Sequence, residues 1–367
     1  MNGILVIAHA PLASAMERCI SHVFSDRPAC FAVLDVQPNV PPEETLAQAR
    51  LVMQQLGCPT SLVMTDIFGA TPCNVAQKLV DAKVAGVIGH LNSGTTIPAS
   101  KLYSDAGIPQ ISPSATNPKY TRQGYKTAFR VVADDVHLGS TLGKYAVENL
   151  KGKNVAVIDD RTAYGQGVAE EFTKAAEAAG AKIVDKQFTN DKATDFNAIL
   201  TSIKGKKPDV VFFGGMDAVA GPMLKQMKSL GIKANFMGGD GICTAELIKL
   251  AGDAIGESQV YCAEAGGVEG EAKVGMDKFR TDFKAKFNID VQLYAPYVYD
   301  ATKLMVAAMV KAGSVDPAKY LPVLAATSDY KGVTGPIAFD EKGDIKNGAL
   351  TLFTYKGGKR EQLAVVR

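Results

Sequence analysis

Two polar loops follow two short apolar strands between Val87 and Tyr120, and this pattern most constrains the fold. Strands are expected at residues 87–89 and 109–112, with a helix at 97–105 between them. In open α/β sheets, ligands bind beyond the carboxyl ends of the parallel strands, which is where these loops would lie. The segment therefore predicts a parallel sheet with a binding site at the carboxyl ends of its strands.

The two loops carry the hydroxyl side chains that an anion site needs. Ser93, Thr95 and Thr96 stand near the expected helix start, where backbone N–H groups lack partners within the helix. A carboxylate bound there would also meet the positive end of the helix dipole. Residues 114–116 form a second group of this kind. Ordinary caps and turns would explain any one of these residues, but two such loops on successive strands favour a site.

Composition changes along the chain. A chain of 367 residues, 47% of them apolar, can form two hydrophobic cores. Its first lysine is Lys78, and four of its six cysteines lie before residue 74. This break indicates two pieces of different origin, joined near residues 74–84. A single domain with an atypical first quarter is the alternative that composition leaves open.

Charge and hydropathy exclude several classes of partner. A net charge of +2 gives no reason to expect nucleic acid or an anionic membrane surface. No apolar run approaches the ~20 residues of a membrane-spanning helix, so no membrane insertion is expected. The first residues lack the charged start of an export signal, which predicts that the chain as it stands remains cytoplasmic. Because no metal-binding or nucleotide-binding motif is present, neither a metal nor a cofactor is expected.

The first 80 residues predict a βαβαβα unit. Strands are expected at residues 3–8, 31–36 and 61–65, with helices at 12–24, at 42–57 and after residue 72. His9 and Asp66 follow the first and third strands, which are neighbours in the usual doubly wound order. A carboxylate beside an imidazole fixes its tautomer and stabilises the imidazolium. On the residues alone, a functional and a structural role for His9 both remain open.

The motifs GILVIAHAPLASAM and LVMTDIFGATPCNVA resemble the mannose-type IIA component of the bacterial sugar phosphotransferase system over about residues 1–76. The resemblance implies that His9 accepts a phosphoryl group from a small phosphocarrier protein and that Asp66 supports it. The turn FGATP, residues 68–72, would supply backbone amides. The remainder of such a domain is missing, so residual phosphoryl transfer at His9 is the only enzymatic activity considered.

The chain from residue 77 onward resembles the branched-chain amino-acid (leucine, isoleucine, valine) binding proteins of ABC importers, which are type I periplasmic binding proteins. The resemblance is carried by VIGHLNSGTTIPASKLYSDAGIPQISPSATNPKY, VAVIDDRTAYGQG, PDVVFFGG, FMGGDG and GPIAFDEKGD. It implies an α/β fold of two doubly wound, flavodoxin-like lobes with a cleft between them. The implied ligand is a branched-chain or related aliphatic amino acid, the implied partner a membrane permease, and the implied location the periplasm.

The same resemblance implies a ligand-binding set: Ser93, Ser114, Ala115, Thr116, Tyr164 and Asp240. Ser93 and Thr116 match ligands of the substrate carboxylate, while the Ser114 carbonyl and Thr116 match partners of the ammonium group. Asp240 matches the acid that completes the ammonium site from the second lobe, and Tyr164 matches an aromatic side chain that covers the ligand. Without the resemblance, Asp240 is interpreted as a turn residue in a Gly-Gly-Asp-Gly bend.

Together the two resemblances predict a chimera. Residues 1–76 would complete a first lobe formed by residues 77–134 and 265–342, and the second lobe would comprise residues 135–264 and 343–367. In the second lobe, a strand is expected at residues 154–159 and helices at 168–179 and 222–230. The first fragment brings three strands where the binding protein needs two. One surplus strand is therefore expected at the edge of the first sheet.

Cys243 and Cys262 are candidates for a disulfide. Cys243 starts a helix that follows the Asp240 loop, and Cys262 lies in the next strand. A helix that returns to an adjacent strand can bring two Cα atoms within the ~5.5–6 Å that a disulfide needs. Relatives exported to an oxidising compartment could form this bridge, and two free buried thiols are the alternative.

Overall fold

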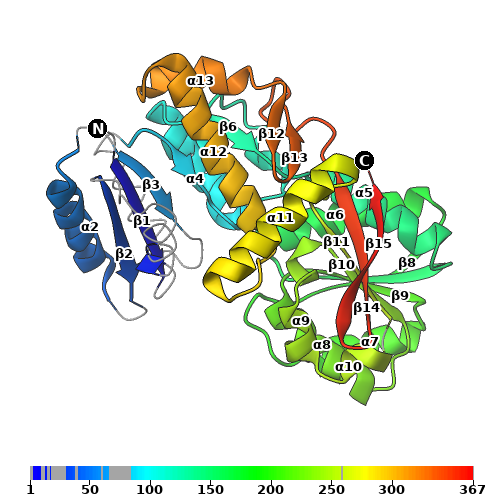
Figure 1. Ribbon diagram of the computed structural model, residues 1–367. Helices are drawn as coiled ribbons and strands as arrows, with labels where there is room; N and C mark the ends of the chain where they lie inside the picture. Colours follow the sequence, from blue (N-terminus) through cyan, green and yellow to red (C-terminus); the bar gives the residue numbers. More distant parts are fainter. Residues whose placement is uncertain are drawn as a thin grey trace. The chain divides into compact units, whose positions relative to one another are not determined.

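The computed structural model describes residues 3–9, 13–14, 17, 30–37, 40–58, 61–65, 84–257 and 259–366 (Figure 1). They belong to two compact α/β units. Unit 1 comprises Met1–Ala115, Lys119–Val132 and Gly270–Lys346, and unit 2 comprises Thr116–Pro118, Ala133–Glu269 and Asn347–Arg367. The sequence predicts lobe boundaries after residues 134, 264 and 342; the units of the structure are divided after residues 132, 269 and 346, and residues 116–118 also belong to unit 2.

Unit 1 contains a parallel sheet with the strand order β2-β1-β3-β4-β5-β6. This order is flavodoxin-like, as predicted. Its strands are β1 (Gly3–His9), β2 (Phe31–Val36), β3 (Ser61–Thr65), β4 (Val87–Ile88), β5 (Gln110–Ser112) and β6 (Ala128–Arg130). The described helices of unit 1 are α2 (Pro42–Leu56), α4 (Ser93–Asp105), α11 (Gly270–Phe287), α12 (Ala295–Ala312) and α13 (Pro317–Ala325).

The prediction of a surplus strand at the edge of the first sheet stays a prediction: of the three strands before residue 66, β2 lies at an edge and β3 does not. β3 lies inside the sheet, paired with β1 on one side and β4 on the other. The predicted pairing of the first and third strands is confirmed, with Ile7 opposite Thr65. Since a doubly wound sheet grows from β1 in both directions, a third strand takes the position beside the first rather than an edge.

The phosphoryl-acceptor set lies almost entirely outside the described residues. His9 is described as the last residue of β1, while its side chain, Asp66 and residues 68–72 are not described. Most of the expected helix 12–24 also lies outside them. The helix predicted at 42–57 is confirmed as α2, and it ends at Gly57, whose φ of 59° is the left-handed conformation that glycine adopts readily.

Unit 2 contains a second sheet with the order β15-β14-β11-β10-β9-β7-β8. The strands β7 (Asn154–Asp159), β8 (Lys182–Phe188), β9 (Val210–Gly214), β10 (Asn235–Gly238) and β11 (Val260–Glu264) are parallel. They repeat the flavodoxin-like order of unit 1. The last two strands, β14 (Leu350–Lys356) and β15 (Lys359–Val366), extend this sheet antiparallel.

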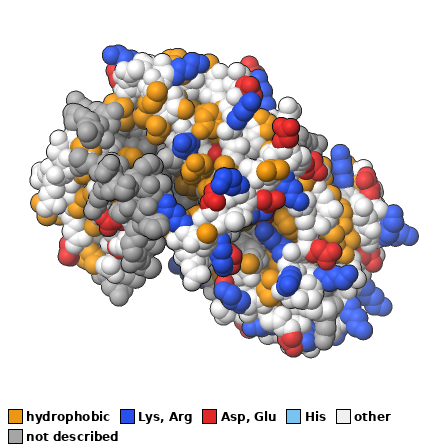
Figure 2. Space-filling model, in the orientation of Figure 1, with side chains coloured by type: hydrophobic (Ala, Val, Ile, Leu, Met, Phe, Trp, Pro, Cys, Tyr) orange, Lys and Arg blue, Asp and Glu red, His pale blue; other side chains and the backbone are white. Residues whose placement is uncertain are grey.

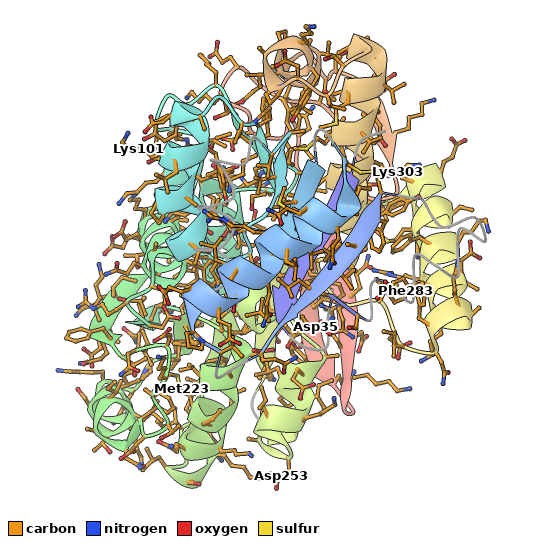
Figure 3. The ribbon with its side chains drawn as sticks, turned by 90° about the vertical axis from the view of Figure 1, so that its left-hand side faces the viewer. Asp35, Lys101, Met223, Asp253, Phe283 and Lys303 are labelled. Carbon is orange, nitrogen blue, oxygen red and sulfur yellow. A yellow bond between two sulfur atoms is a disulfide. The ribbon has the colours of Figure 1, made fainter. Side chains whose placement is uncertain are left out.

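Helices α5 to α10 accompany this sheet: α5 (Asp135–Glu148), α6 (Ala163–Ala178), α7 (Asn197–Lys206), α8 (Asp217–Ser229), α9 (Glu246–Ala251) and α10 (Ala254–Glu257). Side chains of β9 and β10 fill the core, where Phe212, Phe213 and Phe236 are fully buried. On the face drawn in Figure 2, basic and acidic side chains of unit 2 are interspersed. Exposed charges such as Lys101 and Asp253 lie on the outside of their units (Figure 3).

Three helices begin earlier than the sequence indicated. α4 starts at Ser93 instead of residue 97, and α8 starts at Asp217 instead of residue 222. Pro98 and Pro222, which indicated the first turn of each helix, lie further inside these helices. Because a proline near a helix start is most often in the first turn, the sequence predicted both N-terminal ends too late in the chain. α6 starts at Ala163 instead of residue 168, after Thr162 caps it by accepting a hydrogen bond from the Gly165 N–H at 2.9 Å.

A two-stranded hairpin in unit 1 is tied to α12 by one buried carboxyl group. The hairpin consists of β12 (Tyr330–Gly332) and β13 (Gly335–Ile337). Asp300, which is 1% exposed, accepts hydrogen bonds from the Val333 N–H at 3.0 Å and the Thr334 N–H at 2.7 Å. Burial raises the pKa of Asp300, although these hydrogen bonds act in the opposite direction.

Candidate functional site

In unit 1, the loops after β4 and β5 are joined at the carbonyl oxygen of His90. The Ser112 hydroxyl donates to this oxygen at 2.9 Å, and the Thr96 hydroxyl donates to it at 3.1 Å. Ser112 Oγ also accepts the Ala115 N–H at 2.9 Å. All four residues are buried. One serine that the sequence analysis did not select therefore fixes the course of the 112–115 loop.

Ser93 and Ser114, both predicted ligand residues, lie on these same loops. Ser93 is the first residue of α4 and is 1% exposed. The Ser114 hydroxyl donates to the Leu91 carbonyl at 3.0 Å. Because that hydroxyl is engaged within the loop, a role for Ser114 through its backbone fits better than one through its side chain. The Thr95 hydroxyl is likewise engaged, with the Asn92 carbonyl at 2.9 Å.

The imidazole of His90 is buried beneath the same loops. Its Nε2 lies 3.1 Å from the Tyr103 hydroxyl, and the residue is 0% exposed. Burial lowers the pKa of His90 to about 4, because the charged imidazolium would lose its hydration. The ring is therefore neutral at neutral pH, and this loop carries no histidine charge toward a ligand.

Thr116 is the first residue of the chain in unit 2, and it is 0% exposed. Its carbonyl oxygen accepts the Asp135 N–H at 2.8 Å, which attaches the segment to the start of α5. The neighbouring Asn117 donates from Nδ2 to the Ala163 carbonyl at 2.6 Å. Thr116 Oγ1, in contrast, has no hydrogen-bond partner among the described residues.

Tyr164 and Asp240, predicted separately from the sequence, are in direct contact within unit 2. The Tyr164 hydroxyl donates to Asp240 Oδ1 at 2.8 Å and accepts the Gly241 N–H at 2.8 Å. Both side chains are buried, at 4% and 2% exposed. Asp240 begins the short 3-10 helix η3 (Asp240–Ile242), so it is a turn residue and also a contact of the aromatic side chain.

The glycines around Asp240 are required by close packing. A Cβ added to Gly239 would lie 2.7 Å from the Tyr164 hydroxyl oxygen, and one added to Gly241 would lie 2.6 Å from the Gly215 carbonyl oxygen. No side chain can be accommodated against a backbone oxygen at that distance. The Gly-Gly-Asp-Gly sequence therefore allows the loop to approach Tyr164 closely, which the sequence interpretation as a simple bend did not foresee.

Tyr164 is itself positioned by the cap of α6. Asp160 Oδ1 accepts the Thr162 N–H at 3.0 Å and the Thr162 hydroxyl at 2.6 Å. Burial raises the pKa of Asp160, while the two Thr162 hydrogen bonds oppose that shift. This cap sets the first turn of α6, in which Tyr164 stands.

The segment that follows Asp240 is anchored to the sheet of unit 2. Cys243 and Cys262 form a disulfide, the pairing expected from the sequence, with their Cα atoms 5.3 Å apart. The Tyr355 hydroxyl lies 2.8 Å from the Ile242 carbonyl oxygen, and the Arg360 guanidinium donates to the Cys243 carbonyl. A second disulfide, Cys30–Cys58, lies in unit 1. Its pairing was not predicted.

No group of histidine, cysteine, aspartate and glutamate side chains in the described part of the chain could hold a metal ion. Among those same residues, no helix has the length and apolar character needed to cross a membrane.

The two flavodoxin-like sheets define the type I periplasmic-binding-protein fold, and solved structures share it over essentially the whole chain. Leucine binding protein LivK from Thermotoga maritima aligns with a TM-score of 0.78 at 22% identity, covering 100% of this chain and 99% of its own. LivJ from Streptococcus pneumoniae, solved in complex with isoleucine, aligns with a TM-score of 0.77 at 24% identity and the same coverage. At these identities the likeness concerns the fold.

Sequence comparisons identify the family. A family model described as periplasmic binding protein matches residues 71–359. Leu/Ile/Val-binding protein homolog 1 from Brucella abortus is 36% identical over 286 residues, covering 78% of this chain and 76% of that relative. The leucine-, isoleucine-, valine-, threonine-, and alanine-binding protein of Pseudomonas aeruginosa is 36% identical over 281 residues, with coverage of 77% and 74%. The chain belongs to the periplasmic binding protein family.

Proposed function

We propose that this chain is the substrate-binding component of an ABC importer and binds a branched-chain or related aliphatic amino acid. The names of the relatives in Brucella and Pseudomonas support the ligand class. The observation in this chain that carries the proposal is the Thr116 hydroxyl, which is buried and without a partner among the described residues. Buried hydroxyls are nearly always hydrogen-bonded, so a polar ligand group at Thr116 would satisfy it.

The proposed roles divide the charges of the ligand. Ser93 and Thr116 would bind the carboxylate, with the first turn of α4 contributing its dipole. The Ser114 carbonyl and the Asp240 carboxylate would bind the ammonium group, and Tyr164 would hold Asp240 in place while covering the ligand. Ala115 lies between Ser114 and Thr116 and fixes their spacing. Charge-assisted hydrogen bonds of this kind are about twice as strong as neutral ones.

The binding free energy required of this site is within reach of the proposed contacts. A micromolar dissociation constant corresponds to about −8 kcal/mol. Burial of a leucine-sized side chain contributes about 1.5–3 kcal/mol. The remaining binding free energy is within the range that hydrogen bonds to the ligand carboxylate and ammonium groups supply. No catalytic step is required of any of these residues.

Titration calorimetry with leucine, isoleucine and valine tests the proposal. At least one of these ligands should bind the wild-type chain with a micromolar constant. Asp240→Asn should weaken binding by about a hundredfold, because a buried ammonium group would lose its charged partner. The control is Asp253→Asn, which removes a carboxylate whose side chain is 87% exposed and should leave the constant unchanged. The absence of heat with every amino acid at millimolar concentration would overturn the proposal.

We further propose a periplasmic location and a membrane permease as partner. Family membership supports both, and the two disulfides fit an oxidising compartment, where such bonds persist. Fractionation of the natural host with antibodies against this chain tests the location. Recovery in the cytosolic fraction alone would contradict it.

A second candidate function is phosphoryl transfer at His9, on the proposal that residues 1–76 are a phosphotransferase IIA-like fragment. Its supports are the two sequence motifs and the pairing of β1 with β3, the strands that His9 ends and Asp66 follows. The family model begins to match only at residue 71. Incubation with labelled phosphoenolpyruvate and the upstream phosphotransferase proteins should label the wild type weakly and His9→Ala not at all. Absence of any label, or label that persists in His9→Ala, would reject this function.

A further inference from the structure

The buried guanidinium of Arg130 joins separate segments of unit 1. Its Nη1 donates to the Ala115 carbonyl oxygen at 3.1 Å, and its Nη2 donates to Thr121 Oγ1 at 3.1 Å and to Asp344 Oδ1. Thr121 Oγ1 in turn donates to Asp344 Oδ1 at 2.7 Å. The backbone joins the same cluster, since the Arg130 N–H donates to the Gly343 carbonyl at 2.9 Å. Arg130 is 0% exposed.

These contacts gather near the points where the chain leaves unit 1. The chain crosses between the units after residues 115, 118, 132 and 346, and also after 269. Ala115 is the last residue before the first crossing, and Thr121 follows the second closely. Arg130 and Asp344 closely precede the crossings after 132 and 346. The Arg130 side chain thus links its own segment to three others that lie beside these crossings.

The contact with Ala115 also bears on the proposed ligand loop. The Ala115 carbonyl belongs to the same peptide group as the Thr116 N–H, and this peptide is trans. In a trans peptide the carbonyl and the N–H are coplanar and point in opposite directions, so a bond that fixes one fixes the other. A charged donor on the carbonyl also polarises the peptide and strengthens the N–H as a donor.

We infer that Arg130 is a positioning residue for the bound amino acid. Through the Ala115–Thr116 peptide it directs the Thr116 N–H toward the ligand carboxylate, and it does so without touching the ligand. The inference rests on the proposed function, because it requires an amino-acid carboxylate at Thr116. Asp344 balances the charge, so the guanidinium remains buried without leaving an uncompensated cation.

The backbone conformation of Gly343 allows Asp344 to lie beside Arg130. It adopts a φ of +88°, and a Cβ there would lie 2.1 Å from the Ala128 carbonyl oxygen. The turn can pack this closely on β6 only with glycine. The sequence GPIAFDEKGD, which carried part of the family resemblance, therefore supplies the acidic partner of Arg130.

The test compares Arg130→Lys with the wild type. Lysine keeps a positive charge beside Asp344, but one ammonium group cannot reproduce the planar fork that reaches three acceptors. Calorimetry should show the dissociation constant for the preferred amino acid raised about tenfold or more. In the ligand-free protein, the amide proton of Thr116 should move upfield in the NMR spectrum, because its carbonyl has lost a charged donor. Thr121→Val, which loosens the same guanidinium, should give a smaller shift in both measurements.

Asp300→Asn is the matched control. Asp300 is an equally buried carboxylate of unit 1, and it anchors the β12–β13 hairpin without contacting Arg130 or Ala115. It should lower the melting temperature as Arg130→Lys does, yet leave the dissociation constant within about twofold, since its hydrogen bonds go to the hairpin and not to the 112–116 loop.

The possible outcomes separate the two proposals. An unchanged constant and an unchanged Thr116 amide shift in Arg130→Lys would overturn the inference. So would an equal loss of affinity in Asp300→Asn, because it would trace the effect to the general stability of unit 1. If the wild type itself gives no heat with any amino acid, the proposed function fails, which is a different result from failure of the variants alone.

Discussion

The candidate loops of the two units are held by different kinds of interaction. In unit 1, hydroxyl groups from α4 and β5 meet at the His90 carbonyl, and Arg130 holds the end of the loop. In unit 2, the segment after Asp240 is held by a disulfide, and the Asp240 side chain is held by Tyr164. The first loop depends on several individually weak hydrogen bonds, and the second on one covalent bond and on close packing.

The difference follows from the charge that each loop would bring to a ligand. Hydroxyl and N–H groups cost little to bury, so a loop of them needs only hydrogen bonds that keep the groups aligned. A buried carboxylate such as Asp240 is costly unless its surroundings are held fixed, because any movement that removes its partners leaves an unpaired charge. Rigid anchoring is therefore found beside the charged group.

The largest expected effect comes from Gly241→Ala in unit 2. The added Cβ would lie 2.6 Å from the Gly215 carbonyl oxygen, so the Asp240 loop must move away from Tyr164. Overpacking of this kind costs about 1–3 kcal/mol, which corresponds to a loss of affinity of about fivefold to 150-fold if the whole cost opposes ligand binding. Calorimetry measures the loss. Gly256→Ala, at a position where a Cβ would meet nothing within 4 Å, is the control, and equal losses in both variants would contradict the packing argument.

Removal of the unit 2 disulfide should have the next largest effect. The bridge spans a sequence separation of 19 residues, for which the chain-entropy estimate is about 3 kcal/mol. The double variant Cys243→Ala, Cys262→Ala should unfold at lower denaturant concentration and bind the amino acid several times more weakly. Urea unfolding and calorimetry are the measurements. A stability loss with unchanged affinity would show that Tyr355 and Arg360 suffice to hold the loop.

In unit 1, Ser112→Ala should cost about 1–3 kcal/mol of stability, because the buried Ala115 N–H would lose its acceptor. Affinity should fall as the 112–115 loop loosens. The matched variant is Ser202→Ala, whose exposed hydroxyl bond to Asp185 should be dispensable. If Ser112→Ala binds like the wild type, the hydrogen bonds of Arg130 and Ser114 suffice to hold the loop of unit 1.

At neutral pH the smallest effect is expected from the titration of His90, because it changes stability only in acid. Its pKa is about 4 in the folded protein and about 6.5 when unfolded, so below pH 6.5 the unfolded state binds more protons. The stability contribution is complete above pH 6.5 and is lost progressively as the pH drops toward 4. The free energy of unfolding, measured in urea across this pH range, should fall more steeply with decreasing pH in the wild type than in His90→Gln. Parallel curves would show that His90 does not set the acid sensitivity.

The strand pattern was predictable where a buried parallel strand is a short apolar run that ends at a polar residue. Residues 154–159 and 61–65 illustrate this, and both are strands as expected. Helix starts were less predictable. Pro98 and Pro222 stand in the second turn of their helices, and local sequence does not distinguish that placement from the first turn.

Site residues were predictable where they follow a strand and belong to a recognisable motif, as Tyr164 and Asp240 do. Ser112 and Arg130 carried no such signal. A serine at the end of a strand and an arginine in an apolar strand have no local pattern that reveals their partners, since Arg130 meets Asp344 across 214 residues.

The sequence by itself determined the two flavodoxin-like units, the polar loops at the carboxyl ends of their strands and the family, because these depend on local hydrophobic patterns and motifs. Only the tertiary structure decided that Tyr164 contacts Asp240, that Ser112 joins two loops at the His90 carbonyl, and that Arg130 holds the Ala115 peptide. Such contacts depend on the packing of distant segments. Hydrogen-bond geometry is set within tenths of an ångström, and a one-dimensional pattern does not specify it.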